Sequence, residues 1–231
     1  MILAFDTSAA YCAAALLKGD QIIAAQVEEM TRGQAERLMV LLQEVLTAGG
    51  ATYQDLTALG VGVGPGNFTG IRISVATARG LALSLGIPAV GVTAPEATVW
   101  GAARPVAAAV FGSRRMSYAQ RFGADGAGPV LSLPDAEAIA AELGEMLTLS
   151  HSLPFARPAQ SLVEGVARVA GERFRAPQIV QKKILKNENF VPRRVALSRM
   201  DTKACLVCEL NNRRHFFNSG SSITLSTFSN K

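Results

Sequence analysis

The stretch VGVGPGNFTGIRI, Val61 to Ile73, decides the fold, because a glycine-rich loop joins a buried apolar run to a long, nearly uncharged segment. Its thirteen residues include four glycines and one proline. Between a strand and a helix, such a loop can present backbone N–H groups to an anion, since the first helical turn leaves donors unpaired and carries a partial positive charge. The first hypothesis is therefore an anion site formed by Gly64, Gly66, Asn67, Thr69 and Gly70.

Two known phosphate motifs fit this loop poorly. A P-loop needs a lysine to neutralise the β- and γ-phosphates, but none of the four residues after Gly66 is a lysine. A dinucleotide-binding loop needs a carboxylate about twenty residues further on, and residues 86–93 contain none. The alternative left open is that the glycines permit a tight turn and a close approach of helix to sheet.

Apolar runs and turn residues on both sides of the loop predict a mixed α/β sheet covered by helices. The predicted strands are residues 2–8, 12–19, 21–29, 58–63, 87–92, 105–111 and 116–122, and the turn at Lys18-Gly19-Asp20 closes a hairpin. The predicted helices run from Gln34 to the Gly49-Gly50 stop, from an N-cap at Thr69 to Leu85, and over residues 132–147, where Ser132 and Asp135 have capping-box spacing.

The composition predicts a soluble cytoplasmic protein. The chain of 231 residues is 49% hydrophobic and 18% charged, which suits one large or two small domains. Its longest uncharged central run, residues 80–95, is too short and too interrupted to span a membrane, and the N-terminus lacks the basic region of a secretory signal. Three cysteines, an odd number, favour a reducing compartment.

The net charge of +5 comes from the C-terminal tail. Residues 178–231 hold ten Lys and Arg against three Asp and Glu, and six of the seven asparagines. We therefore predict a lobe at 1–105, a smaller second lobe at 106–177, truncated or divergent, and a basic tail at 178–231 that is disordered or that touches a nucleic acid.

Two motifs together resemble those of the TsaB (YeaZ) family. They are MILAFDTS at the N-terminus and GPGNFTGIRISVATARGLA, about sixty residues later. The resemblance covers about residues 1–110 and includes GIPAVGVTAPEA. It thins after Phe111, where Gly112 replaces a common aspartate, and none is found beyond Pro177.

The resemblance implies a two-lobed fold similar to that of actin, sugar kinases and heat-shock ATPases. It also implies a role as a non-catalytic platform. TsaB proteins support a TsaD-type subunit that, with a TsaE-type ATPase, installs threonylcarbamoyl on an adenosine of tRNA (t6A), so tRNA would be contacted indirectly. We expect no catalytic residue, no metal and no cofactor in this chain.

Two residue patterns agree with that expectation, and the role of Asp6 stays open. The first turn reads Asp6-Thr7-Ser8-Ala9-Ala10, without the glycine that lets kinase-like relatives approach a phosphate. The helix RGQAERLMVLL lacks the two histidines by which a TsaD-like subunit binds metal. Asp6 is either a catalytic carboxylate or, more commonly for a strand end, an acceptor for loop N–H groups.

The rest of the chain offers little for other enzyme classes. Cys12 lies in an apolar strand, and the first lobe has no histidine to serve as a hydrolase base. His151 and His215 are predicted to be surface or core residues. Cys205, Cys208 and His215 provide only three of the four ligands of a structural zinc site.

We expect the partner to bind on the first predicted helix, whose apolar residues occupy more than one stripe. The same face is expected to form a homodimer when the partner is absent. The nominated interface residues are Gln34, Leu38, Met39, Leu42 and Val45.

Two other functions stay open at this point. One is a small-molecule kinase or ATPase of the same superfamily that uses Asp6, Thr7, Ser8 and the loop from Gly64 to Gly70 on a nucleotide. The other is a tRNA-binding module based on the basic tail, which would bind with steep salt dependence.

Overall fold

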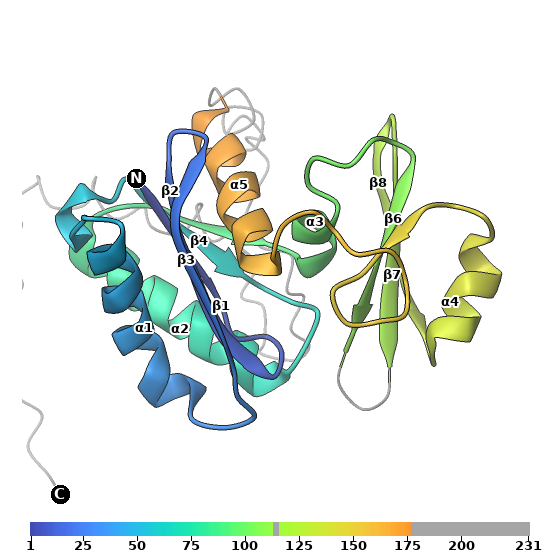
Figure 1. The fold of residues 1–231 in the computed structure, drawn as a ribbon, viewed down its shortest axis with the longest axis horizontal. Helices are drawn as coiled ribbons and strands as arrows, with labels where there is room; N and C mark the ends of the chain where they lie inside the picture. The colour runs from blue at the N-terminus through green and yellow to red at the C-terminus, as the bar shows by residue number, and fades with distance from the viewer. Residues whose placement is uncertain (113–115, 177–231) are drawn as a thin grey trace, which may run out of the picture.

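The computed structural model describes residues 1–112 and 116–176, which form two lobes side by side (Figure 1). The first lobe is built on a five-stranded sheet with the order β3-β2-β1-β4-β5, in which β2 runs antiparallel to its neighbours and β1, β4 and β5 are parallel. Its strands are β1 (Ile2–Asp6), β2 (Tyr11–Lys18), β3 (Gln21–Glu29), β4 (Ala58–Gly62) and β5 (Ala89–Val92).

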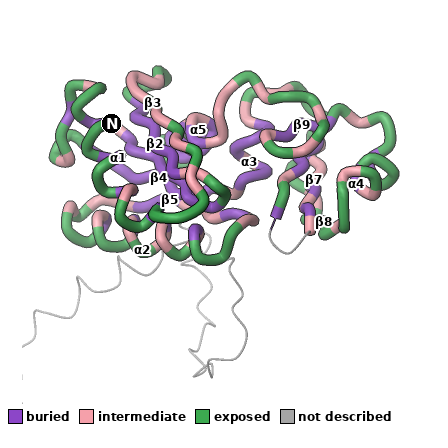
Figure 2. The backbone as a smooth tube through the Cα atoms, turned by 60° about the horizontal axis from the view of Figure 1, so that its bottom comes forward, coloured by how far each residue is buried: buried purple, intermediate pink, exposed green. Residues whose placement is uncertain are grey.

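Strands β2, β1, β4 and β5 are buried on both faces of this sheet, and successive side chains of each strand point into two different cores. In β1, Leu3 and Phe5 face the core under the first two helices, whereas Ile2 and Ala4 face the core on the other side. The strands therefore read as continuous apolar runs, and all five residues of β1 and of β4 are buried (Figure 2).

Helices α1 (Gln34–Ala48) and α2 (Phe68–Leu85) cover one face of the sheet (Figure 1). A single turn of 3₁₀ helix, η1 (Tyr53–Asp55), leads from α1 into β4. The predicted end of α1 at Gly49-Gly50 is confirmed, since Gly49 is the C-cap. The predicted N-cap of α2 is wrong: Asn67, not Thr69, caps the helix, and its side chain reaches the N–H groups of Thr69 and Gly70.

Helices α3 (Ala94–Thr98) and α5 (Leu162–Arg175) cover the opposite face. The sequence analysis assigned residues 106–177 to the second lobe, but α5 packs on the first sheet. Its apolar side chains Val163, Val166 and Ala170 join the core that includes Ile2 and Ala4. Gly60 allows this approach, because a Cβ atom there would lie 3.0 Å from the Cβ of Ala170.

The second lobe is a four-stranded sheet with the order β8-β7-β6-β9. Its elements are β6 (Val106–Phe111), β7 (Ser117–Gly123), β8 (Gly126–Leu133), α4 (Ala136–Leu143) and β9 (Thr148–Leu149). Helix α4 packs on one face through Ile139 and Leu143. The predicted capping box is wrong, since Asp135 is itself the N-cap and accepts from the N–H of Ala138 at 2.8 Å.

The predicted fold class is confirmed: the chain has two lobes with mixed sheets and helices packed on them. The order β3-β2-β1-β4-β5 with an antiparallel β2 is that of the ribonuclease H-like fold. The predicted tail at 178–231 lies outside the described residues. Among those that are described, no helix is long and apolar enough to cross a membrane.

Candidate functional site

The glycine-rich loop is packed directly on the turn after β1. The N–H of Asn67 donates to the Ser8 carbonyl oxygen at 2.6 Å. A Cβ atom added to Gly66 would overlap with that same oxygen, and one added to Gly70 would overlap with the carbonyl oxygen of Thr7. Both positions therefore need glycine so that two backbone segments can touch.

Thr7 joins the turn to the helix from inside. Its backbone N–H donates to the Ser74 hydroxyl at 3.0 Å, and its own hydroxyl donates to the Gly70 carbonyl oxygen at 2.7 Å. The two hydroxyl oxygens are also 2.7 Å apart. Thr7 and Ser74 are both fully buried, so these bonds fix α2 on the end of β1.

Asp6 is buried at the centre of this arrangement, with 1% of its surface exposed. Its carboxylate accepts from the Ser8 N–H at 3.1 Å, from the Ser8 hydroxyl at 2.9 Å, and from the Tyr11 hydroxyl. Burial raises the pKa of Asp6 and outweighs the lowering by these hydrogen bonds. Burial and the neighbouring Asp6 also raise the pKa of Tyr11 well above its usual value.

Two of the first N–H groups of α2 are already bonded. The Asn67 side-chain oxygen accepts from the N–H of Thr69 at 2.9 Å and from that of Gly70 at 3.3 Å. Gly64 has a positive φ of 78°, and its carbonyl oxygen accepts from the N–H of Ala94 at 2.8 Å. An anion at this end of the helix would therefore have to displace the Asn67 cap.

The structure thus brings most of the predicted anion-site residues together, but as partners of one another. Asp6, Thr7 and Ser8 form the turn, and Gly66, Asn67 and Gly70 form the loop on it. The alternative left open by the sequence, glycines used for close approach, is what the geometry shows at Gly66 and Gly70.

The nominated interface needs a correction. Leu38 and Leu42 are 0% exposed, Val45 is 1% exposed and Gln34 is buried as well, because this stripe of α1 packs on the sheet. These side chains are part of the core and are not available to a partner in the folded lobe. Met39 is on the outer side of α1, 43% exposed, beside Val40, which is 50% exposed.

The outer surface of α2 carries two further apolar side chains. Phe68 is 55% exposed and Leu83 is 74% exposed. The guanidinium of Arg72 lies over the Phe68 ring, 4.4 Å from its centre. The sequence analysis missed both residues, although their spacing of fifteen residues, about four helical turns, would have placed them on one stripe.

Comparison with known proteins shows which proteins the chain is similar to. The family model described as TsaD, tRNA N6-adenosine threonylcarbamoyltransferase, matches residues 21–131. The tRNA threonylcarbamoyladenosine biosynthesis protein TsaB of Escherichia coli K12 is 39% identical over 103 residues, which are 45% of this chain and 44% of that protein. TsaB of Bacillus subtilis is 38% identical over 95 residues, 41% of this chain and 42% of that protein. These matches support a TsaB (YeaZ) family assignment.

The match to the curated TsaB relatives spans less than half of their length. YeaZ from Pseudomonas aeruginosa has the same fold: its solved structure matches with a TM-score of 0.59 at 22% identity and covers 75% of this chain and 91% of that chain.

His151 is packed in a loop of the second lobe. Burial and, to a smaller extent, the nearby charge of Arg157 lower its pKa to about 4. Among the described residues, no group of His, Cys, Asp and Glu is placed to hold a metal ion. The weighed zinc ligands Cys205, Cys208 and His215 lie outside the described residues.

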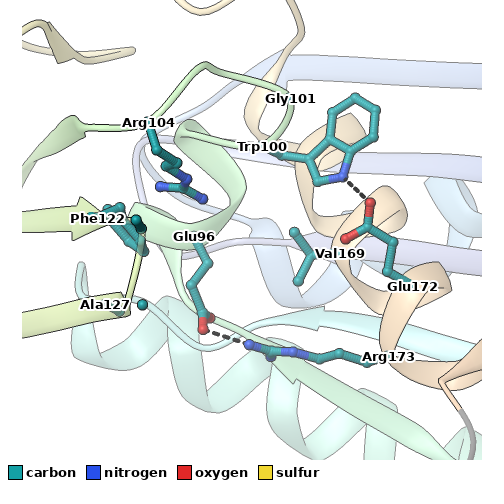
Figure 3. A pocket seen from close by; sticks show the side chains of 12 residues that line it. Glu96, Trp100, Gly101, Arg104, Phe122, Ala127, Val169, Glu172 and Arg173 are labelled. Atoms are coloured by element: carbon teal, nitrogen blue, oxygen red, sulfur yellow. Dashed lines mark hydrogen bonds and ion pairs between the residues drawn. The ribbon is translucent and has the colours of Figure 1, made fainter.

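A cleft that was not predicted lies between the two lobes. The cleft has a volume of about 570 Å³, and Trp100, Arg104, Phe122 and Glu172 line it (Figure 3). These residues come from the linker after α3, from β7 and from the end of α5. No local sequence pattern joins such distant segments, so this cleft could not be predicted.

Proposed function

We propose that this chain is a non-catalytic platform subunit of the t6A modification machinery, which binds a TsaD-type catalytic subunit and works with a TsaE-type ATPase. The names of its curated relatives and the TsaD family model support a role in t6A biosynthesis. In this proposal tRNA is contacted through the complex, in the cytoplasm.

The observation that carries the platform role is the set of exposed apolar side chains on two adjacent helices. Met39 and Val40 project from α1, and Phe68 and Leu83 project from α2, on the same face of the first sheet (Figure 1). Burial of apolar surface contributes about 25 cal/mol per Å², so a partner that covers these side chains gains affinity from each of them. The same surface would support a homodimer of the isolated chain.

The internal bonding of the glycine-rich loop favours this proposal over a small-molecule kinase or ATPase. Nucleotide binding at the loop would need free N–H groups and room beside Asp6. Instead, the Asn67 side chain occupies the N–H groups of Thr69 and Gly70, and Asp6 is enclosed by Ser8 and Tyr11. The loop therefore supports the shape of the lobe that carries α1 and α2.

A matched pair of variants tests the platform role. Val40 on α1 and Val130 on β8 have nearly equal exposure, 50% and 49%, but lie on different lobes. The chain is co-expressed with a TsaD-type protein of the same organism, and the affinity of the pair is measured by pull-down and calorimetry. We expect Val40→Glu to weaken binding by about tenfold or more, because a charge would be desolvated at the contact. Val130→Glu should bind like the unchanged chain.

Circular dichroism confirms that both variants remain folded before the comparison. Equal binding by Val40→Glu and Val130→Glu would refute the α1 surface. Absence of any complex between the unchanged chain and the TsaD-type protein would refute the platform role itself.

A further inference from the structure

We infer, on the basis of the proposed function, that the TsaD-type partner presents a carboxylate to Arg72 of α2. An ion pair at this position adds to the apolar contact made by the exposed side chains of α1 and α2. Because exposed charges are screened by salt, such a pair makes the affinity of the complex depend on ionic strength, which apolar burial alone does not do in this direction.

The outer side of α2 carries one straight stripe of exposed residues. Phe68, Arg72, Ala76, Arg79 and Leu83 follow one another at steps of three or four positions, and all five are exposed. Residues at this spacing share one face of a helix, whereas the opposite side of α2 packs on the sheet. At a rise of about 1.5 Å per residue the stripe is about 22 Å long, so one partner surface can cover it from end to end.

Arg72 is the charge of this stripe that a partner can pair. Within residues 1–112 and 116–176 it makes no ion pair, and its guanidinium carbon lies 4.4 Å from the centre of the Phe68 ring. A guanidinium stacked on a ring uses its flat face, so its N–H groups, which lie in the plane, can still bind both oxygens of a carboxylate. Phe68 is 55% exposed despite this contact, so the partner can also cover the ring beside the charge.

The middle of the stripe lets a partner come close to α2. Ala76 and Gly80 are both exposed and small, and a Cβ atom added to Gly80 would meet nothing within 4 Å. The larger side chains Phe68 and Leu83 stand at the two ends. A surface that fills the middle therefore excludes water near Arg72, and an ion pair is stronger where water is excluded.

The charges of the two outer helices differ in sign. The sequence of α2, residues 68–85, contains two arginines and no Asp or Glu. On α1, Arg37 makes ion pairs with Glu44 and with Glu28 of β3, and the exposed Glu36 makes none within the described part of the chain. A carboxylate of the partner is therefore attracted by α2 and repelled by α1, so these charges select α2 as its side of the surface.

Titration calorimetry of the full chain with the TsaD-type protein tests this ion pair, at about 50 mM and about 500 mM NaCl. We expect the unchanged chain to bind about threefold or more weakly at the higher salt concentration. Arg72→Gln should bind about tenfold more weakly than the unchanged chain at low salt, and its affinity should change less with salt. Arg72→Lys should bind more tightly than Arg72→Gln, because it keeps the charge.

Arg104→Gln is the matched control. Arg104 also lies over a phenylalanine ring, 4.8 Å from the centre of Phe122, but it follows α3 and belongs to neither α1 nor α2. This variant should bind like the unchanged chain at both salt concentrations. Circular dichroism confirms that each variant is folded.

The ion pair is refuted if Arg72→Gln loses no more affinity than Arg104→Gln, or if Arg72→Lys binds as weakly as Arg72→Gln. The proposed function survives either result as long as Val40→Glu weakens the complex, whereas absence of any complex overturns both. An affinity of the unchanged chain that is equal at the two salt concentrations also refutes the ion pair, and this measurement needs no variant to fold.

Discussion

Asn67 bonds to Ser8 across the first lobe: its backbone N–H lies 2.6 Å from the Ser8 carbonyl oxygen, although 59 positions separate the two residues in the sequence. The bond joins the glycine-rich loop to the turn after β1. The side chain of Asn67 simultaneously caps α2. One residue therefore closes the position at which a phosphate would otherwise meet the helix.

The first prediction concerns nucleotide. Because the N–H groups of Asn67, Thr69 and Gly70 are bonded internally, we expect the isolated chain to bind ATP with magnesium no more tightly than about 1 mM. Isothermal titration calorimetry measures this directly. Micromolar binding that disappears in Asp6→Ala would support the kinase or ATPase alternative instead.

The second prediction compares two glycines of α2. Gly70→Ala should destabilise the chain by about 2 kcal/mol or more, because the new methyl group would overlap with the Thr7 carbonyl oxygen and force the backbone apart. Gly80→Ala should stabilise it by about 0.5–1 kcal/mol, since the position is exposed and has nothing within 4 Å. Urea unfolding gives both values. Equal changes in the free energy of unfolding at the two positions would show that Gly70 is not in close contact with the turn after β1.

The third prediction separates core from surface on α1 with adjacent residues. Leu38→Glu places a carboxylate in the core and should cost at least about 3 kcal/mol. Met39→Glu changes an exposed position and should alter stability by no more than about 0.5 kcal/mol. Thermal melting followed by circular dichroism distinguishes them. A normal melting temperature for Leu38→Glu would contradict the burial of this stripe.

The fourth prediction concerns pH and His151. Its pKa is lowered to about 4 in the folded chain, from an ordinary value of 6.5. Between these values the unfolded chain binds the proton and the folded chain does not, so the free energy of unfolding falls as the pH falls through this window. Urea unfolding at a series of pH values measures this free energy. Between pH 6.5 and 4 it should decline less in His151→Gln than in the unchanged chain. If the free energy of unfolding declined equally in both proteins, His151 would be solvated in the folded chain and its pKa would not be lowered.

Strands β1, β2, β4 and β5 of the first sheet were predictable because they are buried on both faces and are mostly apolar. Strand β8 was missed, since its sequence GAGPVLSL combines glycine and proline with an exposed edge. Helix α5 was also missed, although Ser161 and Glu164 form a readable capping box. Its place on the first sheet was not readable, because it depends on contacts with strands more than a hundred positions earlier.

The candidate site, too, was predictable in part. The sequence motifs grouped Asp6, Thr7 and Ser8 with the glycine-rich loop, and the structure places them together. Which hydrogen bonds they make was not readable, because the Asn67 cap and the Ser8 contact depend on backbone directions. The burial of Leu38 and Leu42 was misjudged, since periodicity alone does not tell which of two adjacent stripes faces the sheet.

The position of α5 affects how the chain reaches its folded form during synthesis. The first five strands leave the ribosome long before Val163 and Val166, which later cover Ile2 and Ala4. Until then the face of the sheet that α5 covers is exposed to solvent. That face is buried only after the chain has closed a loop that contains the whole second lobe. The first lobe is therefore completed only after the second has been translated, and a fragment that stops before Leu162 would expose an apolar face to aggregation.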